Sequence, residues 1–349
     1  MLIEKQALLR VLTAAQKVVE RRNTIPILSN VRLVAKDGKL TATATDLDLQ
    51  IQASAPADGD LSVCVAAHLL FDIARKIGGT EVTLRVEGNE LLVVSGRSRF
   101  KLQTLPVSDF PDFTAKELPT AFTTDLAALF CHVRFAISTE ETRYYLNGIF
   151  LHVRDDRLAA VATDGHRLAL NLGGPADDFK GVIVPAKTVG LLPDGELSAR
   201  LSETQIQFEA GDVVITSKLI DGTFPDYQRV IPTGNDKKLV LDRQTFAQAV
   251  DRVSTISTER GRAVKLNIDA DTVRLAVNNP DAGQADEELP AEYSADPVEI
   301  GFNAKYLSEV LSKFPAGDIT VSLNDGGSPT LFSSHETPDY LAVLMPMRV

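Results

Sequence analysis

The sequence predicts an α+β protein made of three copies of one domain, each with two helices and antiparallel sheet. An amphipathic stretch, a strand–turn–strand segment and a second helical stretch recur three times in the same order. Short motifs recur with them at a spacing of about 119 residues, which indicates repeated domains rather than chance. Polar stretches with Gly or Pro separate the copies near residues 116–119 and 233–236, as domain linkers do. The predicted domains are residues 1–118, 119–238 and 239–349.

Each copy begins with apolar residues at helical spacing. Ile137 and Ile256 occupy the same place in the second and third copies, and each is followed by Ser-Thr-Glu. In the first copy one helix face gathers the apolar residues Leu8, Leu12, Ala15 and Val19. The opening helices are expected within residues 3–22, 123–139 and 241–258.

Alternating segments follow each opening helix. Asp37-Gly38 and Asp155-Asp156 separate two alternating runs, where such pairs form tight hairpin turns. The motif Ala44-Thr45-Asp46 of the first copy reappears as Ala162-Thr163-Asp164 in the second. Hairpins are expected within residues 31–53, 148–170 and 264–283, and strand-to-helix segments within residues 62–77, 181–192 and 299–314.

The composition is that of a globular protein. The chain has 349 residues, of which 44% are hydrophobic and 24% charged. It has no apolar run of about 18 residues and no signal peptide, so we expect a cytoplasmic protein without contact to a membrane. Cys64 and Cys131 lie far apart in apolar contexts, so we expect two reduced, buried thiols rather than a disulfide.

Positive charge gathers on the expected helices of an otherwise acidic chain. The six helical segments together carry a net charge of +6 and none of them is negative, whereas the whole chain carries −11. The segments counted are residues 4–22, 66–79, 124–139, 185–192, 242–256 and 303–314. A shared basic face favours contact with the phosphate backbone of a duplex without sequence readout. Few aromatic residues lie among these basic ones, so stacking on unpaired bases is not indicated.

Catalytic and metal-binding motifs are weak. The sequence has no phosphate-binding loop, no HExxH motif and no clustered Cys and His ligands, so we predict no cofactor and no metal site. Asp164 and His166 are the one pair that could serve acid–base chemistry. The corresponding positions of the other copies lack the histidine, which favours a surface turn over an active site.

Several motifs along the chain resemble the bacterial DNA polymerase III beta subunit, the sliding clamp family. They are Pro26-Ile27-Leu28-Ser29-Asn30, Ser95-Gly96-Arg97-Ser98-Arg99-Phe100, Arg143-Tyr144-Tyr145-Leu146-Asn147-Gly148, Ala162-Thr163-Asp164-Gly165-His166-Arg167-Leu168, Phe224-Pro225-Asp226-Tyr227 and Met345-Pro346-Met347-Arg348-Val349. The resemblance implies the DNA-clamp fold and a head-to-tail dimeric ring around duplex DNA. It also implies a non-enzymatic processivity factor that slides on DNA and tethers the replicative polymerase.

The resemblance assigns residues to DNA contact. They are Arg22, Arg75, Tyr144, Tyr145 and Lys187. Two places depart from the family pattern. His68-Leu69 stands where family members often have a basic pair at the start of a helix. Glu140 stands at a polar position three residues before Arg143, where its negative charge would not favour a phosphate.

The resemblance also implies a hydrophobic groove between the second and third domains that binds short linear motifs. The partners it implies are the DNA polymerase III alpha subunit, the clamp loader, and other polymerases and repair proteins. Met345 and Met347 suit such a groove because methionine side chains repack around different peptides. The groove residues implied are Thr163, Gly165, His166, Arg167, Leu168, Pro232, Asn303, Tyr306, Val343, Met345, Pro346, Met347 and Arg348.

The expected homodimer contact joins the first domain of one chain to the third domain of the other. Phe100 and Leu102 would meet Ile256 at an apolar centre. Arg97 and Arg99 supply positive charge beside the first pair, which suits an acidic rim on the third domain.

Two other classes of function stay open from the residues alone. A hydrolase that uses Asp164 and His166 would turn over a generic ester or phosphoester. A repeat scaffold that never meets DNA would fail to load onto nicked circular plasmid.

Overall fold

The computed structural model describes residues 1–20, 23–113, 117–257 and 263–348. Among these residues it has six α-helices and 24 strands, and the strands pair antiparallel, which confirms the predicted α+β class. The chain divides into two compact units, which we call the first unit (residues 1–126 with 190–219) and the second unit (residues 127–189 with 220–349).

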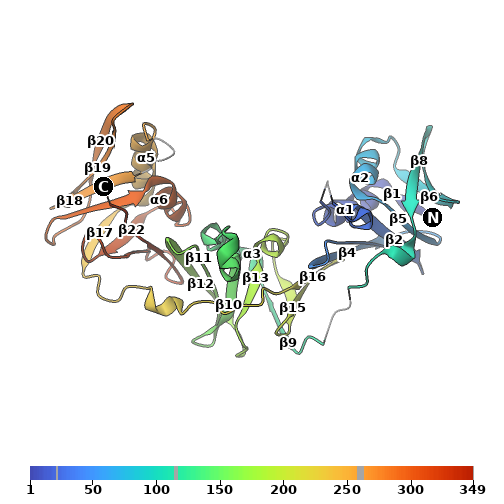
Figure 1. Ribbon diagram of the computed structural model, residues 1–349, viewed down its shortest axis with the longest axis horizontal. Helices are drawn as coiled ribbons and strands as arrows, with labels where there is room; N and C mark the ends of the chain where they lie inside the picture. Colours follow the sequence, from blue (N-terminus) through green and yellow to red (C-terminus); the bar gives the residue numbers. More distant parts are fainter. Residues whose placement is uncertain (21–22, 114–116, 258–262, 349) are drawn as a thin grey trace. The chain divides into compact units, whose positions relative to one another are not determined.

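The first unit holds one twelve-stranded sheet in the order β1-β6-β7-β8-β5-β2-β3-β4-β16-β15-β14-β9. Helices α1 (Lys5–Gln16) and α2 (Ala67–Lys76) pack against each other, as the blue part of Figure 1 shows. The strands are β1 (Leu2–Glu4), β2 (Asn30–Lys36), β3 (Lys39–Thr45), β4 (Leu49–Pro56), β5 (Leu61–Ala66), β6 (Glu81–Glu87), β7 (Glu90–Ser95), β8 (Ser98–Leu105), β9 (Thr120–Thr124), β14 (Leu197–Leu201), β15 (Gln205–Ala210) and β16 (Val213–Lys218).

The second unit holds an eight-stranded sheet, β13-β10-β11-β12-β24-β23-β22-β17, and a four-stranded sheet, β20-β19-β18-β21. Helices α5 (Arg243–Ser254) and α6 (Ala304–Leu311) pack together, and α4 (Ala186–Val189) lies against β10 and β13. The strands are β10 (Gly148–Arg154), β11 (Arg157–Thr163), β12 (Arg167–Pro175), β13 (Val182–Pro185), β17 (Lys237–Asp242), β18 (Ala263–Asp269), β19 (Thr272–Asn279), β20 (Gly283–Pro290), β21 (Val298–Asn303), β22 (Asp318–Leu323), β23 (Thr330–Ser333) and β24 (Tyr340–Leu344).

Short 3-10 helices mark several connections. They are η1 (Pro26–Ser29), η2 (Val107–Asp109), η3 (Arg134–Ala136), η4 (Glu141–Leu146) and η5 (Tyr227–Arg229). The last three lie in the second unit near the pocket described below.

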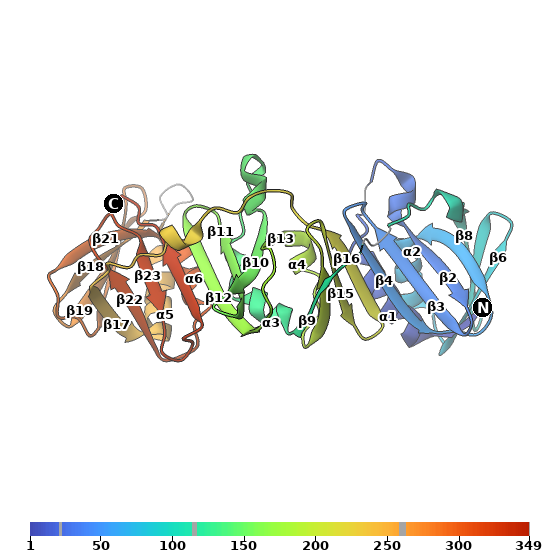
Figure 2. The ribbon, with the colours of Figure 1, turned by 90° about the horizontal axis from the view of Figure 1, so that it is seen from below.

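Two strand pairings join neighbouring predicted domains into continuous sheets. Strand β4 of the first predicted domain pairs with β16 of the second, and β12 of the second pairs with β24 of the third. Figure 2 shows the blue strands β2 to β4 continuing into β16 and β15 within the first unit. Because the strands of the central predicted domain divide between the two large sheets, the chain forms two compact units although its sequence repeats three times.

The hairpin predictions are confirmed. Asp37 and Gly38 have φ of +51° and +78°, and Asp155 and Asp156 have φ of +52° and +59°. Positive φ at both central residues defines the tight turn that matches strand twist. The predicted apolar face of the first helix is also confirmed, because its members are buried.

The expected helices are shorter than their predicted segments, and α3 and α4 are shortened most. Helix α3 (Leu126–Cys131) ends early, where the side chains of Cys131 and His132 both approach the Ala128 carbonyl that the next helical N–H would use. Helix α4 ends at Val189 because Gly190 follows, with Pro193 close behind.

The two thiols differ in burial. Cys64 is buried, and burial raises its pKa to about 11. Cys131 is only partly buried because it ends α3, so the expectation of two buried thiols is wrong for this residue. Both thiols are free.

Candidate functional site

A pocket of about 240 Å³ lies beside the turn between β11 and β12, within the second unit. Its walls come from η4, the β11–β12 turn, the stretch around η5 and the end of β24, which are far apart in sequence. Part of its lining belongs to the buried apolar core of the unit. The lining residues are Arg143, Tyr145, Leu146, Thr163, Gly165, Arg167, Leu168, Pro225, Val230, Val343 and Met345.

Pairing of β12 with β24 brings the end of the chain to this pocket. Leu168 and Val343 face each other in the ladder. One step further on, the Met345 N–H donates to the His166 carbonyl at 2.9 Å. The backbone is held before Met345 by the β12–β24 ladder and after it by the bond from the Met347 N–H to the Gly301 carbonyl. Met345 therefore forms part of the wall while 37% of its surface stays exposed.

The β11–β12 turn is held by its own side chains. Thr163 Oγ1 accepts from the Gly165 N–H at 3.1 Å. Asp164 Oδ1 accepts from the N–H groups of His166 and Arg167 at 2.9 and 3.0 Å. Gly165 has φ of +88°, a conformation that glycine adopts without strain. Short polar residues followed by glycine therefore build the turn locally.

Arg143 forms another wall and is held by Glu140. Its Nε and one terminal nitrogen donate to the two Glu140 oxygens at 2.8 and 2.7 Å. This hydrogen bond lowers the pKa of Glu140 and raises the pKa of Arg143. A Cβ added at Gly165 would lie 2.6 Å from a terminal nitrogen of Arg143. The guanidinium thus occupies the space that a side chain on the turn would need.

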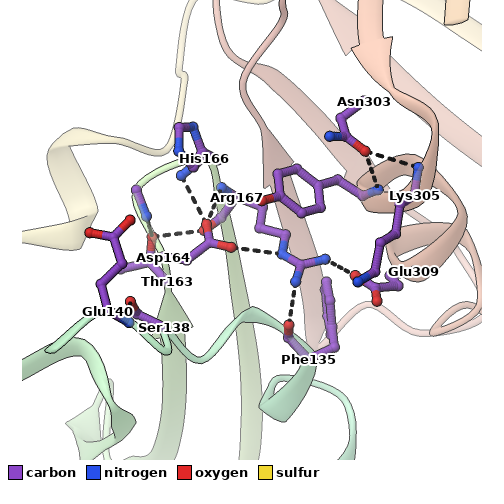
Figure 3. A network of polar contacts seen from close by, with 12 residues as sticks. Phe135, Ser138, Glu140, Thr163, Asp164, His166, Arg167, Asn303, Lys305 and Glu309 are labelled. Carbon is purple, nitrogen blue, oxygen red and sulfur yellow. Dashed lines mark hydrogen bonds and ion pairs between the residues drawn. The ribbon is translucent and has the colours of Figure 1, made fainter. Parts of the chain in front are cut away.

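Arg167 links the turn to two other elements, as Figure 3 shows. Its Nε donates to Asp164 at 3.1 Å, and one terminal nitrogen donates to the Phe135 carbonyl at 2.7 Å. The other terminal nitrogen pairs with Glu309 on α6. The guanidinium carbon lies 4.3 Å from the centre of the Tyr306 ring, and the side chain is only 8% exposed.

The structure gathers part of the predicted groove at this pocket. His166 and Tyr306 lie beside it, with ring centres 6.2 Å apart. The predicted residues that line it are Thr163, Gly165, Arg167, Leu168, Val343 and Met345. The predicted residues outside its lining are His166, Pro232, Asn303, Tyr306, Pro346, Met347 and Arg348.

Two of the residues outside the lining have clear structural roles. The Asn303 side chain caps α6 by accepting from the Lys305 and Tyr306 N–H groups. The Met347 N–H donates to the Gly301 carbonyl at 2.8 Å, which fixes the terminal segment against β21. These bonds extend the attachment of the chain end beyond β24.

Sequence reasoning missed part of the lining. The missed residues are Arg143, Leu146, Pro225, Val230 and, as a pocket residue, Tyr145. All but Val230 lie in motifs that carried the resemblance, and that signal could have found them.

The residues predicted to contact DNA have different environments. Arg22 lies outside the described residues. Arg75, near the end of α2, has a 61% exposed side chain. Tyr144 in η4 is 54% exposed, whereas Tyr145 is partly buried and lines the pocket. Lys187 is an exposed residue of α4.

The residues predicted for the dimer contact also differ. Phe100 on β8 is 37% exposed, whereas Leu102 on the same strand is 6% exposed and packs inside the first unit. Strand β8 pairs with β7 from Ser98 to Gln103, but its pairing with β5 covers only Thr104 and Leu105. Within the described ranges, the rest of that edge has no neighbouring strand. Ile256 is partly buried just after α5.

Asp164 and His166 do not form an acid–base pair here. The Asp164 carboxylate accepts from the turn backbone and from Arg167, and the His166 ring faces Tyr306. Among the described residues, no three His, Cys, Asp or Glu side chains are placed to hold a metal ion. The helices of the described residues are too short or too polar to span a lipid bilayer.

Comparison with known proteins covers the whole chain. The DNA polymerase III beta subunit models match it in order: the N-terminal domain at residues 1–114, the central domain at 122–226 and the C-terminal domain at 228–348. A beta sliding clamp of Caulobacter vibrioides is 45% identical over 368 residues, covering 99% of each chain. One of Pseudomonas aeruginosa is 38% identical over 365 residues, again covering 99% of each.

Solved structures agree with this match. A DnaN sliding clamp of Bartonella birtlesii bound to griselimycin superposes with a TM-score of 0.96 at 44% identity, covering 100% of this chain and 99% of that one. A DNA polymerase sliding clamp of Caulobacter crescentus gives 0.94 at 43% identity, with coverage of 100% and 99%. The chain therefore belongs to the DNA polymerase III beta subunit family of bacterial sliding clamps.

Proposed function

We propose which residues of this chain carry out each part of the sliding-clamp function. Clamps of this family are non-catalytic processivity factors of DNA replication. They form dimeric rings that encircle duplex DNA, slide without reading its sequence and bind polymerase partners. Each part of that function falls to a different set of residues in this chain.

The pocket beside the β11–β12 turn is the site for the short motifs of partner proteins. The observation that carries this assignment is Met345, an exposed apolar side chain whose backbone is bonded to the opposite wall. Exposed Val230 and buried Leu168 and Val343 supply further apolar surface. A peptide with two or three apolar anchors would find matching contacts here.

The expected affinity is modest. Burying an apolar side chain contributes about 1.5–3 kcal/mol, and ordering the peptide offsets part of the gain. A dissociation constant near ~1 µM corresponds to about 8 kcal/mol, which two or three anchors with a few hydrogen bonds can reach. The two pockets of a dimer would then strengthen attachment of a bivalent partner.

A truncation tests the assignment. Removal of residues 345–349 deletes Met345 and the bonds that fix the end of the chain. Binding of a labelled peptide from the polymerase alpha subunit, followed by fluorescence anisotropy, should be lost. Sedimentation should still give a dimer, because the proposed dimer contact lies on other residues. Unchanged peptide binding would place the motif site elsewhere.

Duplex DNA is assigned to the basic helices and their neighbours. The exposed side chains of Arg75, Tyr144 and Lys187 can reach phosphate or sugar without reading bases. Arg22 and Tyr145 complete the assigned set, and Tyr145 also lines the peptide pocket. Weak, unregistered phosphate contact is compatible with sliding.

Two copies of the chain would meet through β8 of one copy and the region after α5 of the other. The exposed edge of β8 with Phe100, and Ile256 after α5, would form the contact between copies. Strand β20, an exposed acidic edge strand, supplies charge that suits Arg97 and Arg99. The proposed domains are residues 1–118, 119–238 and 239–349, and the proposed location is the cytoplasm.

A further inference from the structure

Arg167 uses its polar atoms within the protein. Its three guanidinium nitrogens contact Asp164, the Phe135 carbonyl and Glu309, and its face lies against Tyr306. Only 8% of the side chain is exposed. A guanidinium has donors but no acceptor, and here each nitrogen already has a partner. Little of Arg167 is therefore left to recognise a peptide, although it borders the pocket.

The first copy of the repeat provides an internal comparison for the turn. Thr45 Oγ1 accepts from the Leu47 N–H at 3.0 Å, as Thr163 does from Gly165. Asp46 Oδ1 accepts from the next two N–H groups at 3.0 and 2.8 Å, as Asp164 does.

Leu49 occupies the place of Arg167 in that copy. The Asp46 N–H donates to the Leu49 carbonyl as the Asp164 N–H does to the Arg167 carbonyl. The first copy thus makes the same turn with leucine at this position. The arginine is not needed to build the turn, so its role lies in the elements that it reaches.

Those elements form the surroundings of the pocket. Arg167 ties the turn to η3 through Phe135 and to α6 through Glu309. On the other side of the turn, the His166 carbonyl holds Met345. The turn is therefore attached to α6 through Arg167 and to the terminal segment through His166.

We propose that Glu309 is a positioning residue for peptide binding, acting through Arg167 from outside the pocket. This inference rests on the proposed peptide site. The Arg167–Glu309 pair joins the second predicted domain to the third and sets where the turn stands relative to Met345. Loss of the Glu309 charge would remove one of the two carboxylates paired with Arg167, whose side chain is only 8% exposed and so gains little compensation from water.

The variant Glu309→Gln tests this role. It keeps the size of the side chain and removes its charge, and 35% exposure of Glu309 makes the change compatible with folding. We expect affinity for the labelled alpha-subunit peptide to fall about tenfold, measured by anisotropy. Glu309→Asp should recover part of the loss because it restores the charge.

A second ion pair at the same joint serves as the matched control. Arg157 on β11 pairs with Asp339 at 2.6 Å, which also links the second and third predicted domains but does not line the pocket. The Arg157 hydrogen bond lowers the pKa of Asp339. Asp339→Asn should lower the melting temperature and leave peptide affinity unchanged. Glu309→Gln should show the opposite pattern, with a clear fall in peptide affinity and little change in melting temperature.

The outcomes separate this inference from the proposed function. If the wild-type protein does not bind the peptide, the peptide site itself is misplaced. If the wild type binds and Glu309→Gln binds equally well, Glu309 does not position the pocket. An equal loss with Asp339→Asn would mean that general loosening of the joint, and not Glu309, controls affinity. Arg167→Lys, which keeps the charge but loses the planar fork, should reproduce the Glu309→Gln loss, and normal binding by this variant would also overturn the inference.

Discussion

At Gly165 the backbone favours glycine, and the pocket leaves no room for a side chain. The residue has φ of +88°, and an added Cβ would come within 2.6 Å of Arg143. Leu47 has φ of +80° at the equivalent place of the first copy, so the collision with Arg143 is the stronger constraint. Gly165→Ala should therefore strain the turn by about 1–2 kcal/mol and push the guanidinium from its place in the wall. We expect peptide affinity to fall about tenfold or more in an anisotropy titration.

Gly38→Ala is the control, because it strains the backbone without a collision between the new Cβ and another side chain. Gly38 has a similar φ of +78°, and nothing lies within 4 Å of its added Cβ. This variant should lose a similar amount of stability and keep its peptide affinity. If Gly165→Ala binds peptide as the wild type does, Arg143 does not shape the pocket.

Arg75 offers a test of DNA contact at the scale of one charge. Arg75→Ala should shorten retention of the loaded clamp equally on all DNA sequences and reduce the slope of log K against log salt by about 0.9. Arg85→Ala is the control, since Arg85 is similarly exposed at 65% but lies on strand β6. A loss that depends on DNA sequence would contradict nonspecific backbone contact.

Sequence reasoning works for residues whose role is set by near neighbours. The pair Asp37-Gly38 predicts its turn because both positions need positive φ. Arg143 and Tyr145 as pocket walls do not follow from local chemistry, because η4 reaches the β11–β12 turn only through folding of the whole unit. The inward course of Arg167 toward Glu309, 142 positions away in sequence, is equally invisible in the local pattern.

At the scale of elements, aromatic side chains attach the segment at residues 220–231 to strand β10 of the eight-stranded sheet. The Phe150 ring stacks on Phe224 with ring centres 4.9 Å apart, and it also stacks on His152 at 4.7 Å. His152 Nδ1 faces the Val153 carbonyl, so it carries the proton in the neutral ring and Nε2 can accept from the Tyr227 hydroxyl at 3.1 Å. We call residues 220–231 the strap.

The strap should make stability depend on pH. Burial lowers the pKa of His152 below its ordinary 6.5. The unfolded chain then binds the proton more readily than the folded one, so this contribution to stability is full above about pH 6.5 and is lost as pH falls through the folded value. Urea unfolding between about pH 8 and pH 5 should show the wild type losing stability faster than His152→Gln. Parallel curves for the two proteins would contradict this role.

Helix existence is predicted better than helix length. The apolar spacing around Leu8 gives α1 because many consecutive positions agree. Helix α4 keeps only Ala186–Val189 because Gly190 and Pro193 outweigh the apolar residues around them. Hydrophobic periodicity cannot predict the pairing of β12 with β24, since this pairing joins segments about 170 residues apart.

At the scale of the whole molecule, the dimer contact can be broken at one residue. Phe100→Asp should place an unpaired charge in an apolar contact and give monomers at micromolar concentration in sedimentation experiments. Val86→Asp is the control, because Val86 is 41% exposed on β6, away from the free edge of β8. A Phe100→Asp protein that remains dimeric would move the contact elsewhere.

A closed ring of this kind is expected to hold DNA by topology and not by affinity for a sequence. The most direct measurement is retention of the clamp, loaded by its clamp loader on nicked circular plasmid, before and after the plasmid is cut once. Gel filtration should find the clamp with the circular DNA and should find it released from the linear form, because the ring slides off the ends. Equal retention on circular and linear DNA would contradict the account.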